Sequence, residues 1–400
     1  MERAPQSFLL PDLFAYCQYP LGMNVHCASV AHASEEWLLA EAKFNAKRRS
    51  SFRRLGAGKL TAICYPDTDA TRLRDVNDFL NFLFTLDDWS DEFTDKDTVG
   101  LAGCVMGAFR DPDGFRAQKA AGKLAKSFFG RFRRTAGPGC TRRFIEGMDL
   151  FFRAVAQQAR DRARGDVPSL EEYIALRADT SGCKPCFALI EYAAGIDLPD
   201  DVAADPAIRA LEDAANAHIS WSNDLFSYKV EQARGDMHNM VQVVMRRHNL
   251  SLQAAVDYVG DLTNSSILRF EQDRRNLPSW GEKIDRDVAL YVQGLQDWMA
   301  GALHWSFSDS ARYFGSEGEL VKKTRVVVVR PRASGAGAAQ PHPAHAHAQG
   351  GLSGSLSNGE LAPRKGWASF LMRYACIPAR GRRPRGCCPS SSRDRACKEA

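Results

Sequence analysis

The segment from residue 205 to residue 235 constrains the fold most strongly, because it predicts one helix long enough to cross a domain. Asp205 followed by Pro206 is a favourable helix start, since aspartate caps the free N–H groups and proline suits the first turn. Arg234 followed by Gly235 is a favourable end. About 28 helical residues would extend for roughly 40 Å. The inward apolar stripe, at spacings of three and four, consists of Ile208, Leu211, Ala215 and Ile219.

This stripe becomes polar in the second half of the predicted helix. Asn223, Ser227 and Glu231 continue it at steps of four residues. Their side chains offer an amide oxygen, a hydroxyl and a carboxylate, which are hard ligands of the kind that Mg²⁺ prefers. The pattern therefore predicts a metal-binding face that points into the protein.

A second helix, predicted over residues 69–93, changes in the same way. Asp87, Asp88 and Asp91 continue its apolar stripe, and Glu92 adds a fourth carboxylate. Carboxylates on a core-facing stripe are costly to bury unless they are paired or bind a cation. Because neither helix places His or Cys among these positions, Mg²⁺ is favoured over zinc. The apolar stripe that precedes the aspartates consists of Leu73, Val76, Leu80, Leu83 and Phe84.

Charge divides the chain into a body and a tail. The net charge is +5, yet residues 324–400 contain 13 Lys/Arg and 3 Asp/Glu, which leaves residues 1–323 with 40 basic and 45 acidic residues. We therefore predict one folded domain over residues 1–323 and a disordered, basic, low-complexity tail over residues 324–400. The mildly acidic body argues against a nucleic-acid partner for the main domain.

Other sequence signals predict a cytoplasmic protein. No run approaches the ~18 apolar residues of a membrane span, and the N-terminus lacks the pattern of a secretory signal. The eleven cysteines form no disulfide framework, so reduced thiols are expected. Cys183 and Cys186 make a CxxC pair, but it lies in a helical region and not after a strand, which disfavours a redox function.

The two polar clusters resemble the metal-binding motifs of the class I terpene synthases. LDDWSDEF is similar to their DDxxD/E motif, and NDLFSYKVE is similar to their NDxxSxxxE motif, in the same order along the chain. The resemblance covers about residues 8–323 and is strongest to basidiomycete-type fungal sesquiterpene synthases. It implies an all-α, single-domain helical bundle around a central active-site cavity. The segments that most resemble this fungal group are LRADTSGCKPCFALIEY, WSNDLFSYKVEQARGDMHN and LHWSFSDSARYFG.

The resemblance also implies roles for individual residues. It implies several Mg²⁺ ions, three once diphosphate is bound. Gly182 is expected at a helix break that faces the substrate, and aromatic Phe187 and Trp305 are expected to line the cavity. The implied catalytic aspartates are Asp87, Asp88 and Asp91. The implied metal ligands are Asp87, Asp91, Asn223, Ser227 and Glu231. The implied diphosphate ligands are Arg177, Arg312 and Tyr313.

One position departs from the resembled pattern. Many members carry a lysine directly before the motif glutamate, where this chain has Val230. Lys229 is one residue earlier, and a helix turns by about 100° per residue, so it is not expected to bind diphosphate. Arg234, three residues after Glu231, is an alternative.

The resemblance implies a lyase that ionises a prenyl diphosphate, expected to be farnesyl diphosphate, and cyclises it to a sesquiterpene hydrocarbon. Ring closure between carbons 1 and 11, as in protoilludene-type members, is the preferred prediction. Residues 24–37 are expected to cap the cavity mouth. The first alternative is a chain-elongating synthase of the same fold, which would need a second aspartate-rich motif in place of NDLFSYKVE. The second is a non-catalytic helical protein whose basic tail binds nucleic acid or membrane. The oligomeric state stays open.

Overall fold

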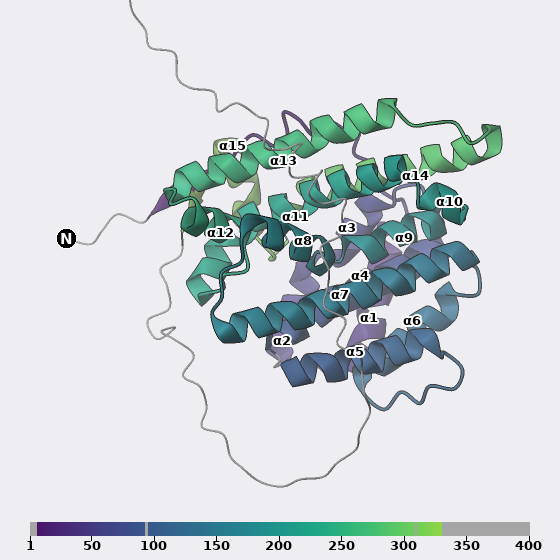
Figure 1. Ribbon diagram of the computed structural model, residues 1–400. Helices are drawn as coiled ribbons and strands as arrows, with labels where there is room; N and C mark the ends of the chain where they lie inside the picture. The colour runs from purple at the N-terminus through teal and green to yellow at the C-terminus, as the bar shows by residue number, and fades with distance from the viewer. Residues whose placement is uncertain (1–5, 93–94, 309, 330–400) are drawn as a thin grey trace, which may run out of the picture. The chain divides into compact units, whose positions relative to one another are not determined.

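The computed structural model describes residues 6–92, 95–308 and 310–329, without the side chains of residues 90–98. All of these lie in Met1–Leu352, the first of two units into which the chain divides. The described part consists almost entirely of helices, so the predicted all-α class is confirmed. Figure 1 shows α13, α11, α7 and α5 as successive rows from the upper to the lower part of the view.

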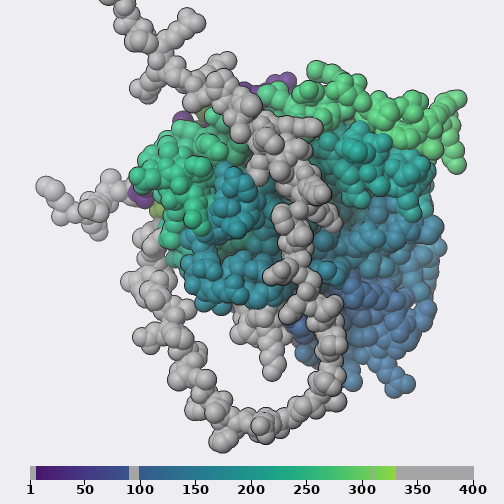
Figure 2. All heavy atoms as spheres, viewed as in Figure 1, coloured from purple at the N-terminus to yellow at the C-terminus, as the bar shows by residue number. Residues whose placement is uncertain are grey.

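The helices have the following bounds in chain order. They are α1 (Cys27–Ala42), α2 (Ala46–Leu55), α3 (Ala57–Cys64), α4 (Ala70–Glu92), α5 (Asp95–Arg110), α6 (Ala120–Phe132), α7 (Pro138–Arg164), α8 (Leu170–Thr180), α9 (Cys183–Ala194), α10 (Asp200–Ala203), α11 (Pro206–Arg234), α12 (Met240–Arg247), α13 (Leu252–Arg275), α14 (Glu282–Ser306), the 3₁₀ turn η1 (Gly315–Glu317) and α15 (Gly318–Thr324). In the space-filling view, the blue helices near α5 and the green helices near α13 lie on opposite sides, with teal α7 between them (Figure 2).

Helix α11 begins and ends where its capping residues predict. The Asp205 side chain accepts a hydrogen bond from the N–H of Ala207, and Pro206 is the first helical residue. Gly235 ends the helix in the left-handed conformation, with φ of 78°, which glycine adopts without the strain that a Cβ atom causes. Ile208, Leu211 and Ala215 of the predicted stripe are buried, Ile219 is half-buried, and α11 packs against α13 and α14, so the polar half of the helix is held at a fixed position.

Helix α4 is anchored at its N-terminal half. Asp69 caps it by accepting hydrogen bonds from the N–H groups of Thr71 and Arg72. Farther along, Asp75 and Asp78 are buried and paired with Arg131 of α6. The helix packs against α1, α3, α6 and α9 through its apolar stripe. Its last residues, which carry the aspartates, extend beyond this anchored half.

The chain is ordered beyond the predicted boundary at Lys323. Strand β1 (Ser7–Leu9) pairs antiparallel with strand β2 (Val326–Val328), with Phe8 opposite Val327. A run of four β-branched valines suits such pairing, and the Val327 side chain is fully buried. The folded unit therefore includes residues 324–329, and the boundary at 323 was too early. The rest of the predicted tail, residues 330–400, lies outside the described residues.

Two sequence-based expectations can be compared with the described part of the chain. None of its helices is long and apolar enough to cross a membrane. Its cysteines are all free thiols: Cys17, Cys27, Cys64, Cys104, Cys140, Cys183 and Cys186.

Candidate active site

A cavity of about 1470 Å³ opens among α2, α4, α7, α8, α9, α11 and α14. One part of its lining is apolar, and the other part carries charged and amide side chains. The apolar and aromatic wall includes Leu80, Leu83, Phe84, Phe151, Ile219, Trp298 and Trp305. The polar part includes Asp87, Asp88, Arg177, Asn223, Ser227, Glu231, Arg312 and Tyr313. The structure thus brings the described members of both predicted clusters to one cavity.

Arg177 joins α8 to the polar half of α11. Its Nε donates to Asp224 Oδ1 at 2.9 Å, and its Nη2 donates to Asn223 Oδ1, also at 2.9 Å. The Tyr173 hydroxyl donates to the second carboxylate oxygen of Asp224 at 2.6 Å. Burial raises the pKa of Asp224, although Arg177 opposes this shift by favouring the carboxylate. Ser169 caps the start of α8. Its hydroxyl accepts a hydrogen bond from the N–H of Glu172, and its own N–H donates to the Glu172 carboxylate. This cap sets the start of the helix that carries Tyr173 and Arg177.

The three oxygen donors on α11 fit a hard cation. The Ser227 hydroxyl is buried and has no hydrogen-bond partner among the described residues. Burial, followed by repulsion from Asp224, raises the pKa of Glu231 to about 8, while its Oε2 accepts a hydrogen bond from Asn239 at 2.9 Å. A buried hydroxyl without a partner and a destabilised carboxylate are both features that a bound Mg²⁺ ion would relieve.

The opposite side of the cavity carries the aspartates of α4. Arg312 Nη2 donates to Asp87 Oδ2 at 2.7 Å, and its Nη1 lies 3.5 Å from Asp88 Oδ1. Burial lowers the pKa of Arg312, but the attraction of these carboxylates outweighs it, so the net shift is upward. The next residue, Tyr313, accepts a hydrogen bond from Asn223 Nδ2 on α11. Residues 312–313 therefore link the aspartate-bearing helix to the amide-bearing helix.

Asp91, the third predicted aspartate, belongs to α4, but its side chain lies outside the described residues. Among the described side chains, no three His, Cys, Asp or Glu come together in a way suited to a metal ion. A metal site here would therefore depend on the amide and hydroxyl oxygens of Asn223 and Ser227 as well as on carboxylates.

The predicted helix break follows Arg177. Helix α8 ends at Thr180 and α9 begins at Cys183. Between them Gly182 has φ of 71°, and a Cβ atom at this position would lie 3.1 Å from a methyl carbon of Leu83. Glycine is thus favoured by the backbone conformation, and a Cβ atom here would also push the Leu83 side chain of α4 slightly aside. Gly182 and Cys183 line the cavity, and burial raises the pKa of the Cys183 thiol to about 11.

The two predicted aromatic lining residues lie in different places. Trp305 lines the cavity, donates from Nε1 to Gly56 O at 3.1 Å, and packs against Phe84 with ring centroids 5.7 Å apart. Phe187 is buried outside the lining and packs against Trp298 at 6.5 Å. The position predicted for Phe187 therefore needs correction. Cys186 occupies the inward position on α9, and the next residue is turned away by about 100°.

The lysine of the α11 motif lies away from the cavity. Lys229 is buried, and its ammonium group lies 4.9 Å from the centre of the Phe314 ring. Val230 lines the cavity in its place, as does exposed Arg234. Lys229 therefore points away from the cavity, as expected from its position one residue before the lysine of the resembled motif.

Sequence reasoning missed several parts of the site. Asp224, which holds Arg177, lies inside the recognised motif but was given no role. Helix α2 supplies Lys47 and Arg48 to the lining, whereas residues 24–37 were expected at the mouth. Within that stretch Asn24 is buried and donates to Tyr65 O and Thr68 O, so it is part of the body of the domain. The short basic sequence of α2 offered no apolar period from which its position could have been inferred.

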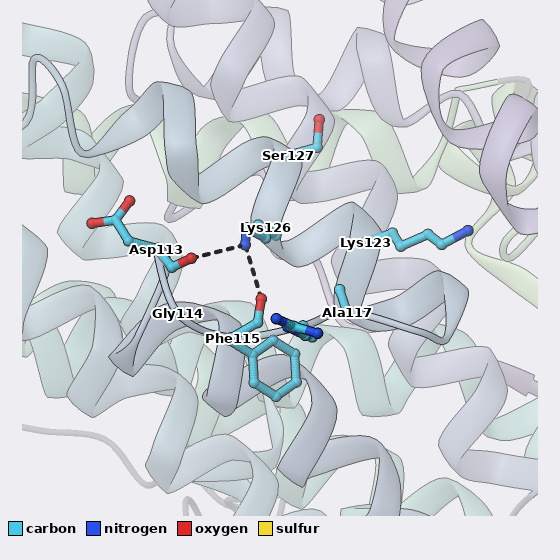
Figure 3. A pocket seen from close by; sticks show the side chains of 8 residues that line it. Asp113, Gly114, Phe115, Ala117, Lys123, Lys126 and Ser127 are labelled. Atoms are coloured by element: carbon cyan, nitrogen blue, oxygen red, sulfur yellow. Dashed lines mark hydrogen bonds between the residues drawn. The ribbon is translucent and has the colours of Figure 1, made fainter.

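A second, open hollow lies at the connection between α5 and α6 (Figure 3). Figure 3 shows the Lys126 ammonium group between the carbonyl groups of Phe115 and Asp113, to which it donates at 2.8 and 3.4 Å. Lys123 forms an ion pair with Glu41 of α1 at 2.9 Å. Lys126 thus fastens the connecting loop to α6, and Lys123 joins α6 to α1, so both cations of this hollow have structural partners.

Comparison with known proteins extends this picture. Residues 78–269 match the family described as terpene synthase family 2, C-terminal metal binding. Sesquiterpene synthase Agr1 of Cyclocybe aegerita is 48% identical over 327 residues, covering 82% of this chain and 94% of that protein. Alpha-muurolene synthase of Coprinopsis cinerea is 48% identical over 334 residues, covering 82% and 78%. Delta(6)-protoilludene synthase of Armillaria gallica is 33% identical over 330 residues, covering 82% and 95%.

Solved structures show the same fold. The SVS_A2 protein from ancestral sequence reconstruction aligns with a TM-score of 0.66 at 25% identity, covering 73% of this chain and 88% of that one. Hedycaryol synthase in complex with HEPES aligns with a TM-score of 0.66 at 23% identity, covering 74% and 98%.

Proposed function

This chain belongs to the terpene synthase family, and on that premise we propose that it is a Mg²⁺-dependent sesquiterpene synthase that ionises farnesyl diphosphate and cyclises it to a hydrocarbon. The observation that supports this most is one cavity whose lining contains two unlike groups of side chains. Oxygen donors and arginines form one group, as a diphosphate with metal ions requires, and aromatic and aliphatic side chains form the other.

The oxygen donors suit the proposed cofactor. Asn223, Ser227 and Glu231 would hold Mg²⁺ from α11, and Asp87 and Asp91 would do so from α4. When bound, the ions supply positive charge that stabilises the diphosphate leaving group as the carbon–oxygen bond breaks.

The chain's own cations and hydroxyls orient the leaving group. Arg177 and Arg312 face the cavity from α8 and from the segment after α14, so they can bind phosphate oxygens from two sides. Tyr313 adds a hydroxyl donor. The electron pair of the breaking bond goes to the diphosphate oxygen, and the arginines stabilise that charge as it develops. Because Arg312 is paired with Asp87, its engagement with diphosphate would also reorganise the aspartate side of the cavity.

The apolar half of the cavity would guide the carbocation. Phe84, Phe151, Trp298 and Trp305 line it, and an aromatic face stabilises a nearby cation by ~0.5–2 kcal/mol. These side chains also exclude water, which would otherwise capture the cation as an alcohol. No described residue of the wall identifies the ring closure. Closure between carbons 1 and 11 stays a prediction, since the relatives named above include both an alpha-muurolene synthase and a protoilludene synthase.

The decisive experiment supplies purified protein with Mg²⁺ and one prenyl diphosphate at a time, of ten, fifteen or twenty carbons. Headspace mass spectrometry should detect hydrocarbon from the fifteen-carbon substrate without isopentenyl diphosphate. Products formed only when isopentenyl diphosphate is added would identify a chain-elongating synthase instead. Absence of any product from all three substrates would contradict the proposed activity.

A further inference from the structure

Helix α2 borders the active-site cavity, although the function proposed above assigns it no role. Asn45, Lys47, Arg48 and Ser51 all line the cavity. Every charged residue between Ala46 and Leu55 is basic. The helix therefore presents a cationic face to a site that should bind a strongly anionic group.

Two other cations of the site, besides lining Arg234, are already engaged with carboxylates. Arg177 bonds to Asp224, and Arg312 bonds to Asp87. Position 230 is a valine, and Lys229 packs over an aromatic ring away from the cavity. A diphosphate carries several negative charges, so the site gains from further cations near its mouth.

Both ends of α2 are attached to parts of the proposed diphosphate site. Near its start, the Phe44 ring lies 6.5 Å from the ring of Trp89, next to the aspartates of α4. At its end, Ser310 Oγ donates to Leu55 O at 2.6 Å, and the N–H of Ala311 donates to Arg54 O at 2.9 Å.

These carbonyl groups belong to the last turn of α2, where no further helical N–H is available to them. Trp305 Nε1 adds a bond to Gly56 O, at the junction of α2 and α3, at 3.1 Å. The segment that leads into Arg312 is thus hydrogen-bonded to α2. A backbone movement of residues 310–312 toward a phosphate would therefore be transmitted to α2.

We propose that α2 is a further diphosphate-binding element, in which Lys47 and Arg48 bind the phosphate oxygens; this rests on the function proposed above. The two side chains supply the charge that a lysine at position 230 would otherwise contribute. They line the cavity from α2, an element that carries neither Arg177 nor Arg312. Their coupling to Arg312 makes the three cations act together.

The test is a double substitution, Lys47→Gln with Arg48→Gln, and a direct measurement of binding. Isothermal titration of the full chain with inorganic diphosphate in the presence of Mg²⁺ should show affinity weakened about tenfold or more, as expected for lost charge-assisted hydrogen bonds. The kcat/KM for farnesyl diphosphate should fall by a similar factor. Arg49→Gln is the matched control, because Arg49 is exposed on the same helix and is not part of the lining. It should bind diphosphate like the wild type.

A second double variant separates charge from fold. Lys47→Arg with Arg48→Lys keeps both charges and should bind diphosphate nearly as the wild type does. Unchanged diphosphate affinity in the glutamine variant would overturn the role of α2, and so would an equal loss in the Arg49→Gln control. If the wild type binds diphosphate through α2 but forms no hydrocarbon, the proposed function fails while the α2 site stands. A wild type that does not bind diphosphate would overturn both.

Discussion

The two helices that carry the polar clusters differ in how firmly their side chains are held. On α11, Asp224 is only 2% exposed, and its carboxylate receives bonds from Tyr173, Arg177 and the N–H of Met240. On α4, the side chains of Asp87 and Asp88 are 38% and 57% exposed and face Arg312 from a segment near the end of the folded unit. One side of the site is built into the core, and the other lies at the mouth.

This difference indicates how the site would work. The α11 side is preorganised, since Arg177 of α8 bonds to Asn223 and Asp224, and Asn239, which caps α12, bonds to Glu231. On the α4 side, Asp87 and Asp88 face Arg312, which a diphosphate would also attract. Substrate binding would therefore draw Arg312 from these carboxylates to the phosphate oxygens. Water exclusion would then follow substrate binding instead of preceding it.

Removing the charge of Asp224 should produce the largest difference in stability between the α11 side and the α4 side. Asp224→Asn should lower the free energy of unfolding by about 3–5 kcal/mol, because it leaves Arg177 without its buried carboxylate. Urea or thermal denaturation measures this loss. Asp88→Asn is the control on the exposed side and should change stability by less than about 1 kcal/mol. Equal losses in the two variants would show that the helices are held alike.

The aspartate side should show the opposite pattern. Asp87→Ala should lower turnover of farnesyl diphosphate by about 10²–10³-fold, because this carboxylate is proposed to bind a Mg²⁺ ion that stabilises the leaving group. Its effect on stability should stay within about 1 kcal/mol, since the ion pair with Arg312 is partly exposed. Steady-state kinetics with matched denaturation curves measures both. Wild-type turnover in this variant would remove Asp87 from the proposed site.

The sequence predicted the features that depend on local signals. The bounds of α11 follow from Asp205, Pro206 and Gly235, which act on the backbone beside them. The convergence of the two clusters was expected from the resemblance, and the cavity contains their described members. Gly182 was also recognisable, because a helix break needs a residue that tolerates positive φ.

Features that depend on distant contacts were beyond such reasoning. The bond from Tyr173 to Asp224 joins residues 51 positions apart, and nothing near either residue signals the other. The pairing of Phe8 with Val327 joins the two ends of the folded unit, so the valine run was assigned to the tail. The inward turn of Cys186 in place of Phe187 depends on a rotation of one residue, which a helical period does not resolve.

Ser227 provides a smaller test of the preorganised side. Ser227→Ala should leave the metal-free protein equally or more stable, because the hydroxyl is buried without a partner among the described residues. The Mg²⁺ concentration needed for half-maximal turnover should rise about tenfold or more. Ser222→Ala is the matched control, since Ser222 also lines the cavity but bonds to Ile219 O on its own helix. An unchanged Mg²⁺ requirement in Ser227→Ala would exclude this hydroxyl as a ligand.

Glu231 should give the metal-free protein a pH-dependent stability. Its pKa is raised to about 8 in the folded state, so folding favours the protonated carboxyl. The stability that this provides is fully present below the unfolded pKa of about 4.3, decreases as the pH rises, and is lost above about 8. Glu231→Gln should therefore flatten the stability profile between these limits and stabilise the metal-free protein at pH 8. Denaturation curves in a chelator at pH 5 and pH 8 measure this. Equal slopes for wild type and variant would mean that Glu231 is charged in the folded protein before any cation arrives, and burial would then not penalise its ionised form.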